Sequence, residues 1–298
     1  MKTAILTGGT GFLGYWLLKE LLKNNTFVYV LVRKGSKRLH RLNGILGIKI
    51  IELDMNNISE LPQYLQTADV FYHLAWEGER NDFYTQMNNI IWAVQAMNVA
   101  HKLGIKQFIM TGSQAEYGIY NQEVDENSPV NPVTAYGACK LACYNILKTL
   151  SAQVAVPLTW VRVFSIYGEG DNPNTLISYL FKCFKENKTP KLTKGNQLWD
   201  FLYAEDAAIA LYLLGEKNKF GIYNLAFGES RPLKEFILEV RNLVSPNSKL
   251  DFDSEIYCNN VKLIANVDKI KSELNWEPLV SFKDGIVKMR SSNNGKNI

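Results

Sequence analysis

Short β-branched runs alternate with longer amphipathic segments through the first half of the chain. This alternation predicts βαβ units and a parallel sheet, because strands that alternate with helices pair in parallel. We expect strands at Thr3–Thr7, Phe27–Val32, Ile48–Leu53, Val70–Leu74, Gln107–Thr111 and Leu158–Val163. We expect helices at Phe12–Lys23, Phe83–Leu103 and Thr134–Ala152, where apolar residues recur at three- and four-residue spacing. The predicted fold is α/β, with a doubly wound, Rossmann-type parallel sheet.

The regular alternation fades after about residue 165. We therefore expect a dinucleotide-binding domain over 1–165, to which segments near 199–225 return, and a smaller substrate lobe over most of 166–298. Asn131 and Pro132 suit the start of the helix that follows them, since Asn caps helices and Pro is favoured in the first turn. The polar residues 291–298 predict a frayed tail.

Composition narrows the class of protein. The chain of 298 residues is 47% hydrophobic and 21% charged, which excludes fibrous, natively unfolded and disulfide-stapled proteins. A net charge of +4 is too small to indicate a nucleic-acid partner. No signal peptide and no apolar run of roughly 18 residues is present, so we expect no membrane association and a cytoplasmic location. Four cysteines without a C-x-x-C pair and 3 histidines predict no metal site and reduced thiols, at Cys139, Cys143, Cys183 and Cys258.

A glycine-rich turn joins the first strand to the first helix. The segment Thr7-Gly8-Gly9-Thr10-Gly11-Phe12-Leu13-Gly14 contains the G-x-G-x-x-G spacing. Glycines there permit a tight turn, a close approach to a pyrophosphate and close packing of the helix on the sheet. A strand-to-helix turn without a ligand is the alternative, but the position between strand and helix favours dinucleotide binding.

The end of the second strand indicates which dinucleotide binds. NAD sites usually carry an acid there for the ribose 2′-hydroxyl, whereas NADP sites offer cations to the 2′-phosphate. This chain has Arg33-Lys34 and no acid. We therefore predict NADP(H), with NAD(H) as the alternative; Arg33 is the principal contact, and Lys34, Ser36 or Lys37 assist. A solvated basic loop is the other interpretation.

Tyr136 and Lys140 lie four residues apart, hence on one face of a helix. A phenol has a pKa of about 10, and a neighbouring ammonium and an oxidised nicotinamide both favour its anion. This pairing suits proton transfer coupled to hydride transfer. Ser113 follows the fifth strand, at the edge of the sheet where ligands bind, and its hydroxyl suits a carbonyl oxygen beside the phenol.

Further motifs occur in order along nearly the whole chain: Asp54, His73-Leu74-Ala75, Asn89, Thr111 to Gly118, Arg162 to Gly168, Asp200 to Tyr203 and Leu274-Asn275-Trp276. Together with the glycine turn and the Tyr136–Lys140 pair, they resemble the extended short-chain dehydrogenase/reductases, in the branch of nucleotide-sugar epimerases, dehydratases and reductases.

The resemblance implies a catalytic set. Tyr136 would exchange the proton, Lys140 would lower its pKa and hold the nicotinamide ribose, and Ser113 would orient the sugar oxygen. It implies cofactor contacts at Thr7, Gly8, Gly11, Phe12, Leu13, Gly14, Asp54, Leu74, Ala75, Trp76, Asn89, Thr111, Val163 and Ile166, and substrate contacts at Ser113, Gln114, Ser165 and Trp199. It further implies a homodimer formed through the helices at 83–103 and 134–152.

The resemblance also narrows the reaction. Family 4,6-dehydratases carry Asp-Glu where this chain has Gln114-Ala115, and Glu116 is displaced by one position, so we do not expect dehydration. A cationic NADP site fits net reduction, so we predict a 4-ketoreductase acting on a nucleotide-linked 4-keto-6-deoxyhexose. The alternatives are a nucleotide-sugar 4-epimerase and a non-catalytic NADP-binding regulator.

Two positions depart from the family pattern. Trp199 replaces the Arg that commonly grips the substrate diphosphate, and Ser165 stands where many members have Asn. Tryptophan stacks on a base or sugar but does not neutralise phosphate, and plain core packing is an equal interpretation of Trp199. The candidates for a replacement cation are Lys191, Lys194 and Lys262.

Overall fold

The protein is described by a computed structural model that covers residues 1–252 and 262–294. Seven parallel strands form a central sheet in the order β10-β6-β5-β4-β1-β2-β3. Their bounds are β1 Thr3–Thr7, β2 Phe27–Val32, β3 Ile48–Glu52, β4 Val70–His73, β5 Gln107–Ser113, β6 Leu158–Val163 and β10 Gly221–Leu225. From β1 the chain builds outward through β2 and β3, then crosses to β4 on the other side. This arrangement confirms the predicted Rossmann-type fold and places the switch point, where ligands bind in such sheets, between β1 and β4.

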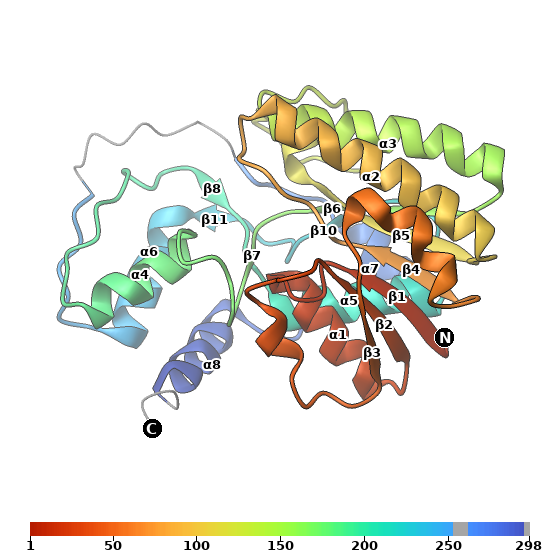
Figure 1. The fold of residues 1–298 in the computed structure, drawn as a ribbon. Coiled ribbons are helices and arrows are strands. Elements are labelled where there is room, and N and C mark those ends of the chain that lie inside the picture. The colour runs from red at the N-terminus through yellow and green to blue at the C-terminus, as the bar shows by residue number, and fades with distance from the viewer. Residues whose placement is uncertain (253–261, 295–298) are drawn as a thin grey trace.

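Helices cover both faces of the sheet (Figure 1). α2 (Phe83–Lys102) packs beside α3 (Ala135–Val154) on one face, and α1 (Phe12–Lys23) packs beside α5 (Ala204–Glu216) on the other. Strand residues alternate between the two layers: Val30 is buried with the α1 side, whereas Phe71 and Phe108 are buried with the α2 side. Burial on both faces explains the continuous apolar character of these strands.

β10 is the strand of the central sheet that the hydrophobic pattern did not resolve. It pairs with β6 over the whole of its length, from Gly221 opposite Thr159 to Leu225 opposite Val163. α7 (Asp268–Leu274) packs against it. The strand therefore joins the sheet more than fifty residues after β6.

A second group of helices lies to one side of the sheet (Figure 1). α4 (Leu176–Lys185), α6 (Leu233–Val244) and α8 (Phe282–Asn294) surround a buried cluster that includes Leu180, Phe236 and Phe282. Two short strand pairs lead into it: β7 (Ile166–Tyr167) with β9 (Leu202–Tyr203), and β8 (Leu198–Trp199) with β11 (Arg231–Pro232). Three 3-10 turns, η1 (Leu39–Leu42), η2 (Met55–Gln63) and η3 (Gln114–Glu116), complete the elements.

Several predicted boundaries shift by one or two residues, and the start of α3 and the end of β5 show the reasons. Thr134, not Asn131, caps α3, because its hydroxyl accepts a hydrogen bond from the Gly137 N–H at 3.1 Å. β5 continues through Ser113 because its ladder with β6 extends to the pair Ser113–Val163.

At the other end of the chain, α8 continues through Asn294, so residues 291–294 are helical rather than frayed. Residues 295–298, the rest of the predicted tail, lie outside the described residues.

Cys139, Cys143 and Cys183 are buried free thiols, and Cys258 lies outside the described residues. Within the described ranges, none of the helices combines the length and apolar character that crossing a membrane requires.

Candidate active site

The glycine turn between β1 and α1 lies against the segment that follows β4. Gly8 has φ +74°, and a Cβ there would come within 2.8 Å of the main chain of Leu74 and Ala75. A Cβ on Gly14 would lie 2.1 Å from the Gly8 carbonyl oxygen. The Thr7 hydroxyl accepts a hydrogen bond from the Ala75 N–H at 3.1 Å, which ties the two strand ends together. Glycine is therefore needed at both positions for this turn to pack, whether or not a ligand binds there.

The start of α1 suits an anion. The helix follows Gly11 without a side-chain cap, and its first turn contains no acidic residue. Its first N–H groups, at Phe12, Leu13 and Gly14, carry the partial positive charge of the helix N-terminus. These features fit the diphosphate of a dinucleotide.

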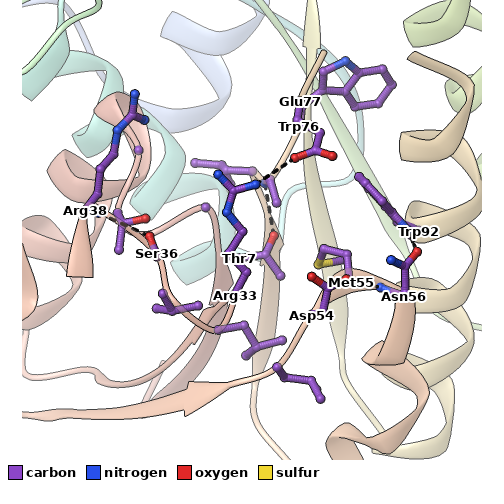
Figure 2. A pocket seen from close by; sticks show the side chains of 18 of the residues that line it. Thr7, Arg33, Ser36, Arg38, Asp54, Met55, Asn56, Trp76, Glu77 and Trp92 are labelled. Atoms are coloured by element: carbon purple, nitrogen blue, oxygen red, sulfur yellow. Dashed lines mark hydrogen bonds and ion pairs between the residues drawn. The ribbon is translucent and has the colours of Figure 1, made fainter. Parts of the chain in front are cut away.

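A cavity of about 700 Å³ lies over the carboxyl ends of β1, β2 and β4 (Figure 2). We call it the dinucleotide cavity. Eight of the predicted cofactor residues line it: Thr7, Gly8, Gly11, Arg33, Asp54, Leu74, Ala75 and Trp76. Its size is in the range of small-molecule sites. Its lining combines the glycine turn with cationic and polar side chains, which fit a dinucleotide.

The basic loop after β2 borders this cavity. Arg33, Ser36, Lys37 and Arg38 line it, but Lys34 does not. Figure 2 shows Arg33 reaching toward Glu77, and its Nη1 donates to Glu77 Oε2 at 3.2 Å. A carboxylate that follows β4 therefore competes for the arginine that we expect to bind a phosphate.

The other predicted cofactor residues do not line the cavity: Phe12, Leu13, Gly14, Lys34, Asn89, Thr111, Tyr136, Lys140, Val163 and Ile166. Asn89 bonds instead to the main chain of a residue that does line it. Its buried amide accepts the Glu77 N–H and donates to the Glu77 carbonyl, both at 2.9 Å. Asn89 thus fixes the main chain of the residue that pairs with Arg33.

Several lining residues were missed by the sequence analysis: Thr10, Arg38, Met55, Asn56, Glu77 and Trp92. Trp92 lies on α2, and its indole N–H donates to Asn56 Oδ1 at 2.8 Å (Figure 2). Within the apolar pattern of the helix, nothing distinguished Trp92 from a core residue. Its place in the cavity depends on how α2 packs.

The three predicted catalytic residues come from two elements. Ser113 ends β5, whereas Tyr136 and Lys140 lie in the first two turns of α3. The Lys140 ammonium donates to the Thr111 carbonyl at 2.6 Å. Burial lowers the pKa of Lys140 to about 8. The indole of Trp76 contacts both α3 side chains, with its ring centre 3.7 Å from Lys140 Nζ and 6.2 Å from the ring centre of Tyr136.

Opposing effects act on the phenol of Tyr136. Burial raises its pKa, and the negative charge of Glu116 raises it further. A hydrogen bond with Ser113 and the positive charge of Arg80 lower it. Lys140 Nζ lies 5.7 Å from the ring centre, and its hydrogen bond goes to Thr111. Of the two predicted partners, Ser113 is thus the one that lowers the pKa of the phenol.

Arg80 is a further residue that the sequence analysis missed. Its guanidinium carbon lies 5.6 Å from the centre of the Tyr136 ring. Its main-chain carbonyl accepts the Tyr136 N–H at 2.9 Å. The segment before α2 is therefore bonded to the first turn of α3, a contact that no local pattern indicates.

A second cavity, of about 430 Å³, lies beside the α4–α6 helices. Ser165 and Trp199 line it, as does Ile166, but Ser113 and Gln114 do not. Among the described residues, Lys191 is the only basic residue in its lining, so neither Lys194 nor Lys262 is brought there. We call it the substrate-lobe cavity. It adjoins the strand ends, since Val163, two residues before Ser165, pairs with Ser113.

Comparison with known proteins identifies the family. A model of the NAD dependent epimerase/dehydratase family matches residues 4–226. The chain belongs to this family. Membership in the epimerase/dehydratase family confirms the predicted resemblance to nucleotide-sugar enzymes of the extended short-chain type.

Relatives of this epimerase/dehydratase family member match most of its length. It is 25% identical to the uncharacterized UDP-glucose epimerase YtcB of Bacillus subtilis strain 168, over 95% of each chain. It is 27% identical to dTDP-6-deoxy-L-talose 4-dehydrogenase (NAD(+)) of Aggregatibacter actinomycetemcomitans, over 81% of this chain and 92% of the relative. The crystal structure of UDP-glucuronic acid 4-epimerase from Bacillus cereus in complex with NAD has the same fold, with a TM-score of 0.87 at 23% identity and 100% coverage of both chains.

Proposed function

We propose that this protein oxidises and reduces C4 of a nucleotide-linked sugar, and that its reaction is 4-epimerisation. The observation that carries the proposal is the convergence of Ser113 and Tyr136, with Lys140 buried behind them, beside the dinucleotide cavity. The names of similar proteins support a 4-epimerase better than the 4-ketoreductase that the sequence analysis preferred.

The proposed site divides the chemistry among these residues. A nicotinamide bound in the dinucleotide cavity would supply a reversible hydride acceptor. Tyr136 takes the proton of the sugar 4-hydroxyl as C4 is oxidised, and returns it when C4 is reduced on its other face. The Ser113 hydroxyl orients the same oxygen, while the Lys140 cation binds the ribose and favours the phenolate.

Dehydration does not fit the site. Gln114 and Ala115 carry no acid, and Glu116 is fully buried in an ion pair with Arg162 at 2.9 Å. Removal of water from a sugar needs an acid and a base that reach the substrate. A non-catalytic NADP-binding regulator is also disfavoured, because Ser113, Tyr136 and Lys140 are all present and grouped.

NADP(H) remains the proposed cofactor, with NAD(H) as the alternative. Three cationic side chains, Arg33, Lys37 and Arg38, border the dinucleotide cavity and suit a 2′-phosphate. The carboxylates of Asp54 and Glu77 line the same cavity and suit a free ribose hydroxyl. The NAD named with similar proteins supports the alternative.

We place the sugar nucleotide in the substrate-lobe cavity. Its lining is mainly apolar and aromatic, with Trp199 and Phe201 available to stack on a base or sugar. Lys191 is the cation positioned there for a diphosphate. The reductase of a 4-keto-6-deoxy sugar is the second candidate, which the basic loop and the 4-dehydrogenase relative favour.

We further propose a homodimer and a cytoplasmic location. Tyr84, Met87 and Ile91 are exposed and follow one another at three- and four-residue spacing along α2. Exposed apolar stripes of this kind mark interfaces.

Product analysis distinguishes the two reactions. The enzyme is incubated with UDP-glucose or UDP-galactose and catalytic NAD⁺ or NADP⁺, and separately with dTDP-4-keto-6-deoxyglucose and stoichiometric NADPH. Interconversion of the UDP-sugars without net cofactor change supports the epimerase, whereas NADPH consumption supports the reductase. Tyr136→Phe should lower kcat by at least about 100-fold with little change in cofactor affinity. Retained turnover in this variant would contradict the proposed site.

A further inference from the structure

Glu116 is a fully buried carboxylate that accepts hydrogen bonds on both oxygens. Its Oε1 accepts the Ser113 N–H at 2.8 Å and the Trp160 indole N–H at 3.0 Å. Its Oε2 accepts from Arg162 Nε at 2.9 Å and again from Trp160 at 3.2 Å. The carboxylate therefore joins the end of β5 to β6.

The network lies directly against the main chain of β5. Gly112 pairs with Arg162 across the β5–β6 ladder. A Cβ on Gly112 would come within 2.2 Å of the Trp160 indole nitrogen and 2.4 Å of Glu116 Oε1. Glycine at this position thus gives the carboxylate room to reach the Ser113 N–H.

Stability alone is a weak reason for such a pair. Desolvation of two buried charges roughly cancels their attraction, and apolar replacements of buried pairs are often as stable. The Glu116–Arg162 pair has side-chain exposures of only 0% and 3%. What the pair does provide is a fixed geometry for the residue it contacts, Ser113.

Ser113 is held from two sides. Its extended backbone, with φ −151° and ψ 148°, presents the N–H to Glu116, and its hydroxyl accepts the Ala115 N–H at 3.2 Å. The same hydroxyl interacts with the Tyr136 phenol and lowers its pKa. We propose that Glu116 is a positioning residue: its buried carboxylate fixes the Ser113 main chain so that the Ser113 hydroxyl faces Tyr136. Its importance for turnover rests on the proposed function, but the contact that it fixes does not.

The test measures the Ser113–Tyr136 contact without a substrate. The protein is labelled with ¹³Cζ-tyrosine, the Tyr136 resonance is assigned with Tyr136→Phe, and its pKa is followed by NMR titration. Ser113→Ala should raise this pKa by about half to one pH unit, the effect of losing one hydrogen bond. In a Glu116→Gln background, Ser113→Ala should leave it nearly unchanged, because the hydroxyl no longer faces the phenol.

The comparison between backgrounds is needed because Glu116→Gln by itself has opposing effects on the pKa of Tyr136. It removes a negative charge that raises the Tyr136 pKa, and it releases the hydroxyl that lowers it. The nearby charges of Arg80 and Lys140 are common to both backgrounds. An equal rise on Ser113→Ala in both backgrounds would overturn the proposal.

Glu126→Gln is the matched control. Glu126 contacts the same region, since its carboxylate accepts the Asn224 N–H at 2.8 Å and its carbonyl accepts from Arg162, but no hydrogen bond joins it to Ser113. In this background Ser113→Ala should raise the pKa as fully as in the wild type. If Glu116→Gln does not fold, Glu116→Gln/Arg162→Gln removes both buried charges and serves instead.

Turnover gives a separate readout. In whichever sugar reaction proves active, the losses in kcat caused by Ser113→Ala and Glu116→Gln should combine less than multiplicatively, as expected when one residue acts through the other. Absence of any sugar turnover would contradict the proposed function and leave the NMR result for Glu116 intact.

Discussion

The Lys140 ammonium lies 3.7 Å from the centre of the Trp76 ring and donates to the Thr111 carbonyl at 2.6 Å. The ammonium thus contacts a π face and a neutral oxygen. Its side chain is almost wholly buried. Burial lowers the pKa of Lys140 to about 8, because desolvation disfavours the charged ammonium.

The first prediction concerns the pH dependence of cofactor binding. Lys140 carries its charge below pH 8 and loses it as the pH rises through about 8. We expect NADPH affinity, measured by fluorescence titration between about pH 6 and pH 10, to fall across this window because the cation contributes to binding. Lys140→Met should bind weakly throughout and lack this alkaline limb; the same limb in the variant would assign it to another group.

The second prediction concerns the choice between NADP and NAD. Arg33→Asp should weaken NADPH binding by about 10- to 100-fold, the loss of a charge-assisted hydrogen bond, while sparing NADH. Equal losses for both cofactors would contradict the role given to Arg33. Lys34→Ala, which alters a cation outside the cavity lining, should have the smaller effect.

Glu77→Gln tests the competition for Arg33 directly. The Arg33–Glu77 pair is exposed, with side-chain exposures of 68% and 53%, so its strength is modest. We expect the variant to bind NADPH up to about fivefold more tightly and NADH no better, because Arg33 is released for the 2′-phosphate. Calorimetric titration with both cofactors measures the difference, and a parallel change in the two affinities would show that Glu77 acts elsewhere.

The third prediction concerns stability in acid. His73 is buried beside Thr7, with 3.0 Å between Nδ1 and Oγ1, and burial lowers its pKa from 6.5 to about 3. Between these values the unfolded chain binds a proton that the folded chain does not, so the free energy of unfolding falls as the pH falls from 6.5 toward 3. This contribution amounts to about 1.4 kcal/mol per pH unit.

Urea unfolding of the wild type and His73→Asn at several pH values isolates this effect. Groups with the opposite sign, such as Asp200, whose pKa burial raises to about 6, are present in both proteins and cancel in the difference. We expect the variant to lose stability less steeply below pH 6.5, by about one proton. Identical slopes would show that His73 does not remain neutral in the folded protein.

The fourth prediction concerns the proposed dimer. Ile91→Glu places a charge in the exposed stripe of α2 and should shift the protein from dimer to monomer in size-exclusion chromatography with light scattering. Leu279→Glu is the control, because Leu279 is as exposed as Tyr84, at 82%, but lies between α7 and α8. Dissociation by the control alone would move the interface away from α2.

Local sequence patterns were sufficient to predict much of the candidate site. The glycine turn was predictable because strand, turn and helix are contiguous, and steric limits at Gly8 and Gly14 act within a few residues or on the adjoining strand end. The pair Tyr136 and Lys140 was predictable because helical periodicity places residues four apart on one face. The predicted bounds of the first three strands were correct to within one residue, because strand signals are also local in the sequence.

The sequence by itself determined the fold class, the glycine turn and the positions of the catalytic candidates, since these follow from short-range periodicity and backbone sterics. The tertiary structure alone decided that β10 completes the sheet beside β6, that Glu77 reaches Arg33, that Arg80 lies over Tyr136, and that Arg162 and Trp160 bond the carboxylate of Glu116. Each of these relationships joins residues on different elements. Such contacts depend on how elements pack and pair, and the pattern of a single segment carries no information about its neighbours in space.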